Sequence, residues 1–109
     1  KNYQYHYFRK VGTRNAQAIS KVVFAGVLEK ESNNNIKEVK IAIGSVAPTP
    51  LRCVQTELFL MNKKIDDTVI KNACDTLLSE IMPIDDIRSS EYYRRRVAKN
   101  LLRQFLSRT

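Results

Sequence analysis

The stretch that most constrains the fold is Ile41–Leu58, which reads IAIGSVAPTPLRCVQTEL. It starts inside an apolar, strand-like run, Val39–Val46, that stops at a Pro-Thr-Pro loop. Because proline has no backbone N–H, Pro48 and Pro50 cannot extend a hydrogen-bonded ladder, and the strand must end there. Apolar residues with helical spacing follow almost at once: Leu51, Val54, Leu58 and Met61. The stretch therefore predicts a corner where a strand leads into a helix.

The helix after this corner is expected at about Val54–Met61. Thr49 followed by Pro50 suits a helix N-cap and first turn. The residues between the loop and the helix, Leu51–Cys53, are left open, because they could equally form a brief strand.

A hairpin is expected before the corner. Ile19–Lys30 is rich in β-branched residues and apolar on both alternating faces, which is typical of a central strand. Within it, Gly26 would let another backbone approach closely or mark a bulge. The polar segment Glu31–Asn35 suits a turn, since asparagine tolerates a positive φ. A second strand at Ile36–Val46 then predicts an antiparallel pair.

The N-terminal segment, Asn2–Val11, carries Tyr3, Tyr5 and Tyr7 at alternating positions, with Phe8 out of phase. This alternation predicts an extended segment with one aromatic face. Two interpretations follow. The tyrosine rings could cover part of the core, which is the favoured interpretation, or they could form a platform for a planar ligand or base.

Two amphipathic helices are expected in the second half of the chain. Asp66 or Asp67 caps the first helix, and Pro83 ends it. Ser89 or Ser90 starts the second. The apolar stripes that define the two helices are Val69, Ile70, Ala73, Leu77, Leu78 and Ile81, then Tyr93, Val97, Leu101, Leu102 and Phe105. We therefore predict one α+β domain, residues 1–109: an antiparallel sheet of about three strands, with about three helices packed on one face.

The residue inventory offers little catalytic chemistry. His6 is the single histidine, and Cys53 and Cys74 are the two cysteines, too few for a structural zinc site. No Walker or G-x-G-x-x-G pattern is present, so we expect no catalytic residue and no metal site in this chain. The apolar runs are shorter than a membrane helix requires. Two cysteines outside any paired motif suit reduced thiols and a cytoplasmic location.

The chain carries 19 Lys and Arg against 11 Asp and Glu, a net charge of +8. Such a charge suits nucleic acid, an anionic cofactor or an acidic partner surface. The excess gathers at the two ends of the chain, at Arg9, Lys10 and Arg14 in front, and at Arg94, Arg95, Arg96, Lys99, Arg103 and Arg108 behind.

Three segments, in order and spacing, resemble one known family: YFRKVGTRNAQAISKV, IAIGSVAPTPLR and PIDDIRSSEYYRRRVAKNLL. The resemblance, from about Tyr7 to Phe105, is to the C-terminal domain of the FAD-binding subunit of molybdenum hydroxylases. That family includes xanthine dehydrogenase, carbon monoxide dehydrogenase and nicotinate dehydrogenase. It implies an antiparallel sheet with three helices, in agreement with the pattern above.

The resemblance also implies a function, partners and cofactors. The chain would be part of an FAD-dependent oxidoreductase, inactive alone, and a chain that opens at Lys1 is expected to be excised from a longer subunit. The N-terminal domain of that subunit would hold most of the FAD, and partner subunits would carry iron–sulfur clusters and molybdopterin. Electrons would pass from molybdopterin through the clusters and FAD to an acceptor.

Two residues are assigned to the flavin by the same resemblance. Lys10 resembles the family's flavin-contacting lysine, and Arg14 resembles part of a segment that lies close to the flavin. Pro48–Arg52 and Asp85–Arg88 are expected to serve structure or subunit contacts.

Two other classes of function stay open beside this one. A basic nucleic-acid-binding module would use the run Arg94–Arg96 for phosphates and the N-terminal rings for stacking. Against it, the same helix needs Tyr93, Val97 and Leu101 for packing. The third class is a protein-interaction domain with no ligand.

Overall fold

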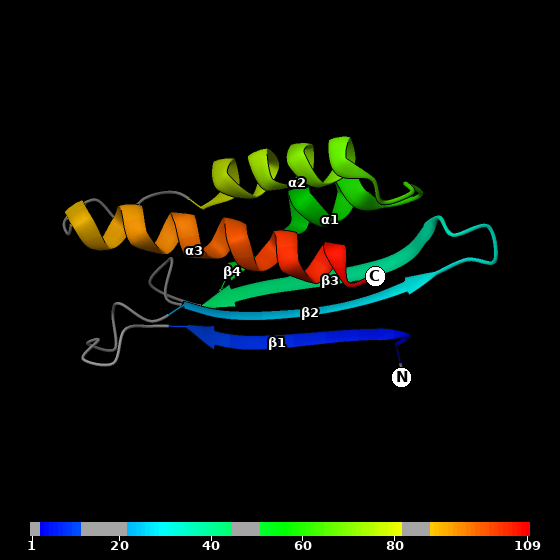
Figure 1. The fold of residues 1–109 in the computed structure, drawn as a ribbon, viewed down its shortest axis with the longest axis horizontal. Helices are drawn as coiled ribbons and strands as arrows, with labels where there is room; N and C mark the ends of the chain where they lie inside the picture. The colour runs from blue at the N-terminus through cyan, green and yellow to red at the C-terminus, as the bar shows by residue number, and fades with distance from the viewer. Residues whose placement is uncertain (1–2, 12–21, 45–50, 82–87) are drawn as a thin grey trace.

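The computed structural model describes residues 3–11, 22–44, 51–81 and 88–109, and the side chains of residues 88–94 lie outside that description. Four strands form one sheet in the order β1-β2-β3-β4, and every neighbouring pair is antiparallel. Three helices follow (Figure 1). The elements are β1 (Tyr5–Val11), β2 (Val22–Lys30), β3 (Ile36–Gly44), β4 (Leu51–Arg52), α1 (Val54–Leu60), α2 (Asp67–Glu80) and α3 (Arg88–Ser107).

The predicted α+β class is confirmed, with a fourth strand added. The sequence left open whether Leu51–Cys53 forms a brief strand. In the structure Leu51–Arg52 is a strand that pairs with β3, and Cys53 takes the N-cap position of α1. The outer ends of several predicted elements, at Asn2, Ile19–Lys21, Ser45–Val46 and Pro83, lie outside the described residues.

The β2–β3 hairpin forms where the sequence predicts it. Its turn is closed by two backbone hydrogen bonds, from Glu31 N to Asn35 O at 2.8 Å and from Asn34 N to Glu31 O at 2.9 Å. Asn34 adopts a φ of 71°, the positive value that asparagine tolerates better than most residues. The hairpin makes β2 a central strand between β1 and β3, as its two apolar faces predict.

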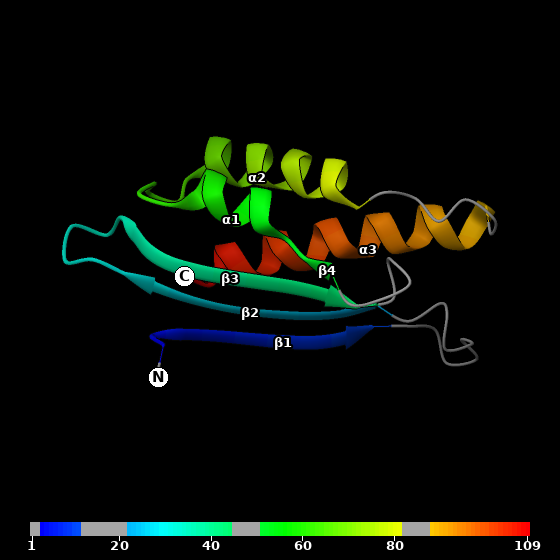
Figure 2. The same cartoon turned by 180° about the vertical axis from the view of Figure 1, so that it is seen from behind.

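The helices gather on one side of the sheet, and Figures 1 and 2 show this from opposite directions. α1 packs against β3, and α3 packs across β1 and β2. α2 contacts α1 and α3 and thus lies above them, further from the strands. The sheet therefore has one face under helices, which we call the inner face, and an opposite outer face.

Three aromatic rings fill the core between α3 and the inner face. Tyr7 of β1, Phe24 of β2 and Phe105 of α3 are buried, with centroids 5.7 to 6.0 Å apart. The Tyr7 hydroxyl donates to Gln104 Oε1 at 2.5 Å, so this buried polar group is satisfied. The favoured interpretation of the N-terminal segment is confirmed at Tyr7, whose ring covers the core.

Gly26 makes room for this cluster. A Cβ at Gly26 would lie 2.9 Å from Phe105 Cε2, closer than a carbon contact allows. The glycine thus permits close approach of an aromatic ring, whereas the sequence predicted approach of a backbone or a bulge. The irregularity of the hairpin lies elsewhere, between Glu29 and Lys30.

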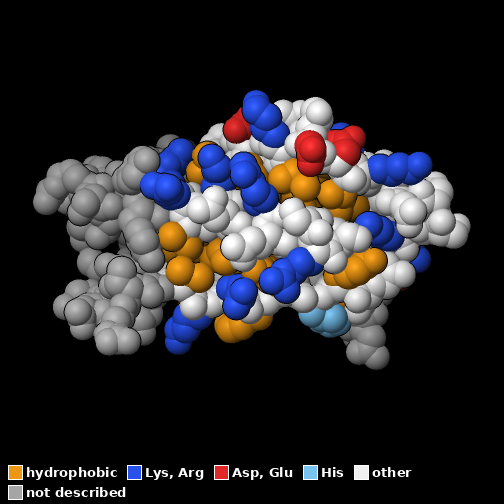
Figure 3. Space-filling model, in the orientation of Figure 1, with side chains coloured by type: hydrophobic (Ala, Val, Ile, Leu, Met, Phe, Trp, Pro, Cys, Tyr) orange, Lys and Arg blue, Asp and Glu red, His pale blue; other side chains and the backbone are white. Residues whose placement is uncertain are grey.

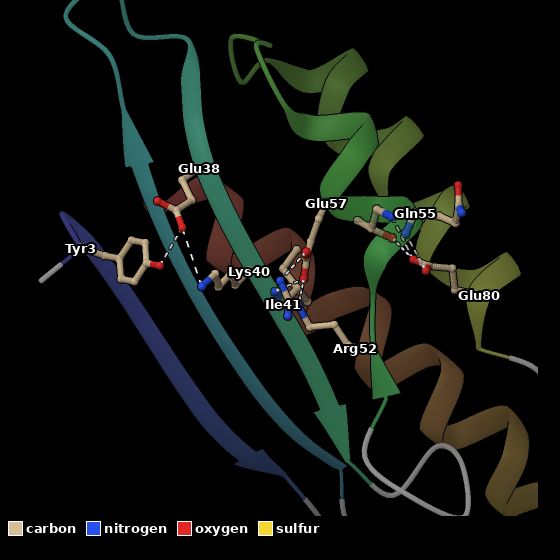
Figure 4. Close-up of polar contacts among 9 residues, drawn as sticks. Tyr3, Glu38, Lys40, Ile41, Arg52, Gln55, Glu57 and Glu80 are labelled. Carbon is tan, nitrogen blue, oxygen red and sulfur yellow. Dashed lines mark hydrogen bonds and ion pairs between the residues drawn. The ribbon is translucent and has the colours of Figure 1, made fainter. Parts of the chain in front are cut away.

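A buried glutamate ties the corner together. Glu57 of α1 is 8% exposed, and its Oε2 accepts the backbone N–H of Ile41 at 2.8 Å. The same carboxylate accepts Arg52 Nε at 2.5 Å and Arg52 Nη2 at 2.9 Å (Figure 4). One side chain thus connects β3, β4 and α1. A carboxylate removed from water is tolerated here because charged and backbone donors surround it.

A second glutamate caps α1 from another helix. Glu80, at the end of α2, accepts the backbone N–H of Gln55 at 2.8 Å and of Thr56 at 2.9 Å. These are donors that the first helical turn leaves without partners. The prediction of a cap at Thr49 is wrong, because α1 begins at Val54 after Cys53, which makes no side-chain cap. For α2 the predicted cap is confirmed, since Asp66 Oδ1 accepts Val69 N at 2.7 Å.

The aromatic packing gives a first testable prediction. Gly26→Ala should lower the free energy of unfolding by about 1–3 kcal/mol, because the new methyl overpacks a buried ring. Gly44→Ala is the matched control in the same sheet, since its Cβ would meet Val23 Cβ at an ordinary 3.7 Å. Urea unfolding measures both. Equal midpoints for the two variants would contradict the packing that we describe.

The corner gives a second prediction. Glu57→Gln should lower the free energy of unfolding by about 1–3 kcal/mol, because it weakens bonds to Arg52 and Ile41 that are largely shielded from water. Asp75→Asn is the control, because its 3.8 Å ion pair with Lys71 on α2 is exposed, and it should cost less than about 1 kcal/mol. Chemical denaturation compares them, and a loss for Glu57→Gln no larger than that of the control would refute the role of the corner.

Candidate functional site

The outer face of the sheet is the candidate functional site. Side chains alternate between the two faces of a strand, so residues that pair across strands share a face. On β2 the inner residues Phe24 and Leu28 are fully buried, while Val23, Ala25 and Val27 on the outer face are half-buried. The centre of the outer face is therefore apolar, even though the helices cover the other side.

A hollow of about 390 Å³ lies on this face. Its axis is a row of four residues paired in register across the sheet, which are Phe8, Ala25, Ala42 and Arg52. The hollow exists because the two middle positions are alanines, while a large side chain stands at each end. Phe8 is 67% exposed, an unusual state for a phenylalanine.

A second row, His6, Val27 and Lys40, borders the hollow. Lys40 Nζ lies 3.7 Å from Glu38 Oε2, and the same oxygen accepts a hydrogen bond from the Tyr3 hydroxyl at 2.9 Å (Figure 4). Arg52 is engaged by Glu57, and this side-chain hydrogen bond is the main cause that raises the pKa of Arg52. The two cations at the rim therefore already have anionic partners within the chain.

Lys10 lies at the end of β1, opposite Val23. It is exposed, and alternation along β1 places it on the outer face with His6 and Phe8. Two residues of a strand span about 7 Å, so Lys10 stands just beyond the hollow. Among the described residues it has no ion pair. Within the described part of the chain, therefore, no carboxylate neutralises its charge.

Arg14, the second residue assigned to the flavin, lies within residues 12–21, outside the described part of the chain. The structure therefore places one of the two predicted site residues. It adds Phe8, Ala25, Ala42 and Arg52, which sequence reasoning did not assign to a site. Two features of the sequence could have indicated them: Phe8 is out of phase with the alternating tyrosines, and the strand β2 is apolar on both faces.

The thiols are structural. Burial raises the pKa of Cys53 to about 12 and also raises the pKa of Cys74, so both are neutral near pH 7 and poor nucleophiles. Within the described residues no group of three or more His, Cys, Asp or Glu side chains is arranged to hold a metal. In the same residues no helix is long and apolar enough to cross a membrane.

The basic side chains of α3 serve packing in part. Figure 3 shows Lys and Arg side chains spread over the face of the molecule on which α3 lies. Arg95 Nη1 donates to Leu78 O at 3.1 Å and to Ile81 O at 2.7 Å, which satisfies carbonyls at the end of α2. Arg95 is thereby committed to a structural role, which weakens the case for a phosphate-binding run at Arg94–Arg96.

The described residues thus define a small α+β domain whose outer sheet face carries an apolar hollow and Lys10, a lysine with no ion pair among those residues. Residues 6–109 match the family model for the CO dehydrogenase flavoprotein C-terminal domain. The chain belongs to this family.

Individual proteins with similar sequences extend the comparison. The chain is similar to the glyceraldehyde dehydrogenase medium chain of Sulfolobus acidocaldarius, with 36% identity over 66% of this chain and 26% of that protein. It is also similar to the xanthine dehydrogenase FAD-binding subunit of Escherichia coli O157:H7, with 26% identity over 90% of this chain and 33% of that protein. The chain thus spans about a quarter to a third of these relatives.

The fold recurs in a solved structure, that of quinoline 2-oxidoreductase from Pseudomonas putida 86. The TM-score is 0.76 at 22% identity, over 95% of this chain and 36% of that chain. At this identity the similarity concerns the fold.

Proposed function

We propose that this chain acts as the C-terminal domain of the FAD-binding subunit of a molybdenum hydroxylase of the xanthine dehydrogenase type. The observation that carries the proposal is the family match over residues 6–109. The protein as a whole would be an oxidoreductase, and this domain would support its flavin site. Partner subunits would carry iron–sulfur clusters and molybdopterin, and the assembly would be cytoplasmic.

Within this proposal, Lys10 is the residue of this chain that meets FAD. Its side chain is exposed and without an ion pair among the described residues, which suits a group that must reach an anion outside its own domain. When bound, FAD supplies the electron-carrying chemistry. A cation held beside the flavin ring favours the negative charge that reduction places there. Arg14, four residues further along the sequence, would add a second positive charge.

The chain's own contribution is to fix where Lys10 stands. Lys10 lies in a strand whose neighbour, β2, is held on both sides by antiparallel pairing. Tyr7, three residues earlier, is buried against Phe105, so β1 is anchored to α3. The lysine therefore projects from a rigid strand, which positions a binding group more accurately than a loop does.

Lys10→Ala in the full-length subunit tests this assignment. We expect FAD binding to weaken roughly threefold to tenfold, because an exposed charge contributes modestly. The flavin potential should become more negative by up to about 30 mV, the equivalent of tenfold for a two-electron couple. Equilibrium titration of the apoprotein and a redox titration measure the two quantities.

Lys71→Ala is the matched control, because Lys71 is a 76% exposed lysine on α2, away from the sheet. If Lys10→Ala and Lys71→Ala behave alike in a subunit that holds FAD, Lys10 is only a surface charge. A full-length subunit that fails to bind FAD would refute the proposed function itself.

A further inference from the structure

We propose that a cleft between α2 and α3 binds the phosphate group of a small organic molecule. The cleft has a volume of about 230 Å³, and it is lined by Leu78 of α2 and by Arg95, Arg96 and Lys99 of α3. It lies on the helix side of the sheet, so its ligand is separate from the FAD that Lys10 on the outer face would meet. The inference goes beyond the proposed function and does not depend on it.

The cleft carries a positive charge that the described residues do not balance. Of the four residues that line it, three are cationic and none is acidic. Within the described ranges Arg96 and Lys99 form no ion pair. The acidic side chains in the second half of α2 are engaged elsewhere. Asp75 pairs with Lys71 at 3.8 Å, and Glu80 accepts two backbone N–H groups of α1.

The spacing along α3 brings the three cations together. Residues three and four positions apart on a helix are neighbours on its surface, so Lys99 stands beside both Arg95 and Arg96. Like charges at this spacing destabilise a helix. An anion bound among them replaces that repulsion with attraction. The cluster therefore suits a bound anion better than it suits an isolated helix.

Arg95 is already oriented for such an anion. Its Nη1 donates to Leu78 O at 3.1 Å and to Ile81 O at 2.7 Å, which holds the guanidinium against the end of α2. The remaining N–H donors of the guanidinium, on Nε and Nη2, make no hydrogen bond within the described part of the chain. The bonds that weaken the case for a run of phosphate contacts along α3 thus favour a single site, because donors fixed in advance lose less entropy on binding.

The donors of the cleft favour a phosphate over a carboxylate. A phosphate monoester carries about −1.5 to −2 charges at pH 7 and three strong acceptor oxygens. A carboxylate carries one charge and two oxygens. Two guanidinium groups and one ammonium group match the larger charge and the larger number of acceptors.

The size and the apolar wall of the cleft favour a small organic phosphate. Pockets for drug-sized ligands enclose roughly 300–1,000 Å³, and this cleft is smaller. Leu78 and the aliphatic stems of the cationic side chains form its wall. In a phosphate ester with a short apolar group, the phosphate would meet the cations and the apolar group would lie against Leu78. Inorganic phosphate would leave that wall in water.

The test is isothermal titration calorimetry of the full-length protein with phenyl phosphate, inorganic phosphate and acetate. We expect phenyl phosphate to bind saturably and roughly threefold more tightly than inorganic phosphate, because its ring buries apolar surface. Acetate should bind most weakly. Arg96→Gln and Lys99→Gln should each weaken the binding of phenyl phosphate roughly threefold to tenfold, because each removes one charge beside the anion.

Lys37→Gln is the matched control, because it removes the same charge from an exposed lysine at the start of β3. That residue adjoins the β2–β3 turn, which Figure 1 shows far from the end of α2. The control should bind phenyl phosphate as the wild type does, and thermal unfolding without ligand should be the same for all three variants.

Three results would overturn the proposal. The wild type would show no saturable binding of phenyl phosphate, or neither Arg96→Gln nor Lys99→Gln would change its affinity, which would place the binding elsewhere on the protein. An equal loss for Lys37→Gln would show a response to total charge rather than a site. Equal affinities for phenyl phosphate and inorganic phosphate would contradict the organic ligand and leave the inorganic ion as the occupant.

Discussion

The structure depends on one carboxylate, that of Glu57, at the corner between sheet and helices. It accepts the backbone N–H of Ile41 in β3 and two bonds from Arg52 in β4, while belonging to α1. The chain changes there from strand to helix, and the carboxylate adds side-chain bonds between these elements to the backbone pairing of β3 with β4. The same bonds hold Arg52 at the rim of the outer hollow, so the interaction that organises the fold also shapes the candidate site.

Much of the fold could be predicted because the spacing of apolar residues along each segment indicates whether it is a strand or a helix. Alternation over Ile36–Val46 and the helical stripe of α2 report burial directly, and both elements appear where expected. What the sequence could not give are contacts between residues far apart. Glu80 caps α1 from 24 residues away, and Gly26 is required by a ring on α3 rather than by a turn or bulge. Nothing local to either residue encodes its partner.

The candidate site, too, could be predicted from the sequence only in part. Lys10 was predicted through the resemblance, and the structure places it exposed at the end of β1, while Arg14 lies outside the described residues. The hollow could not be predicted, because it requires the register that aligns Ala25 with Ala42 and both with Phe8. Register is a property of paired strands. Phe8 is exposed on one side of β1 and Tyr7 is buried on the other, so the two faces of the sheet differ: the inner face belongs to the core and the outer face is accessible in this domain.

The central claim, that Lys10 on the outer face meets FAD in the full-length subunit, requires that this face is covered there. This can be measured at His6, the one histidine of the chain, which is exposed beside the hollow. The rate at which diethyl pyrocarbonate modifies His6 would be compared between the 109-residue chain and the flavin-loaded full-length subunit by mass spectrometry, with Lys71 as the reference site. We predict that modification of His6 slows at least tenfold in the subunit while that of Lys71 is unchanged. Equal rates at His6 in both would show that the face stays open, and would contradict this account.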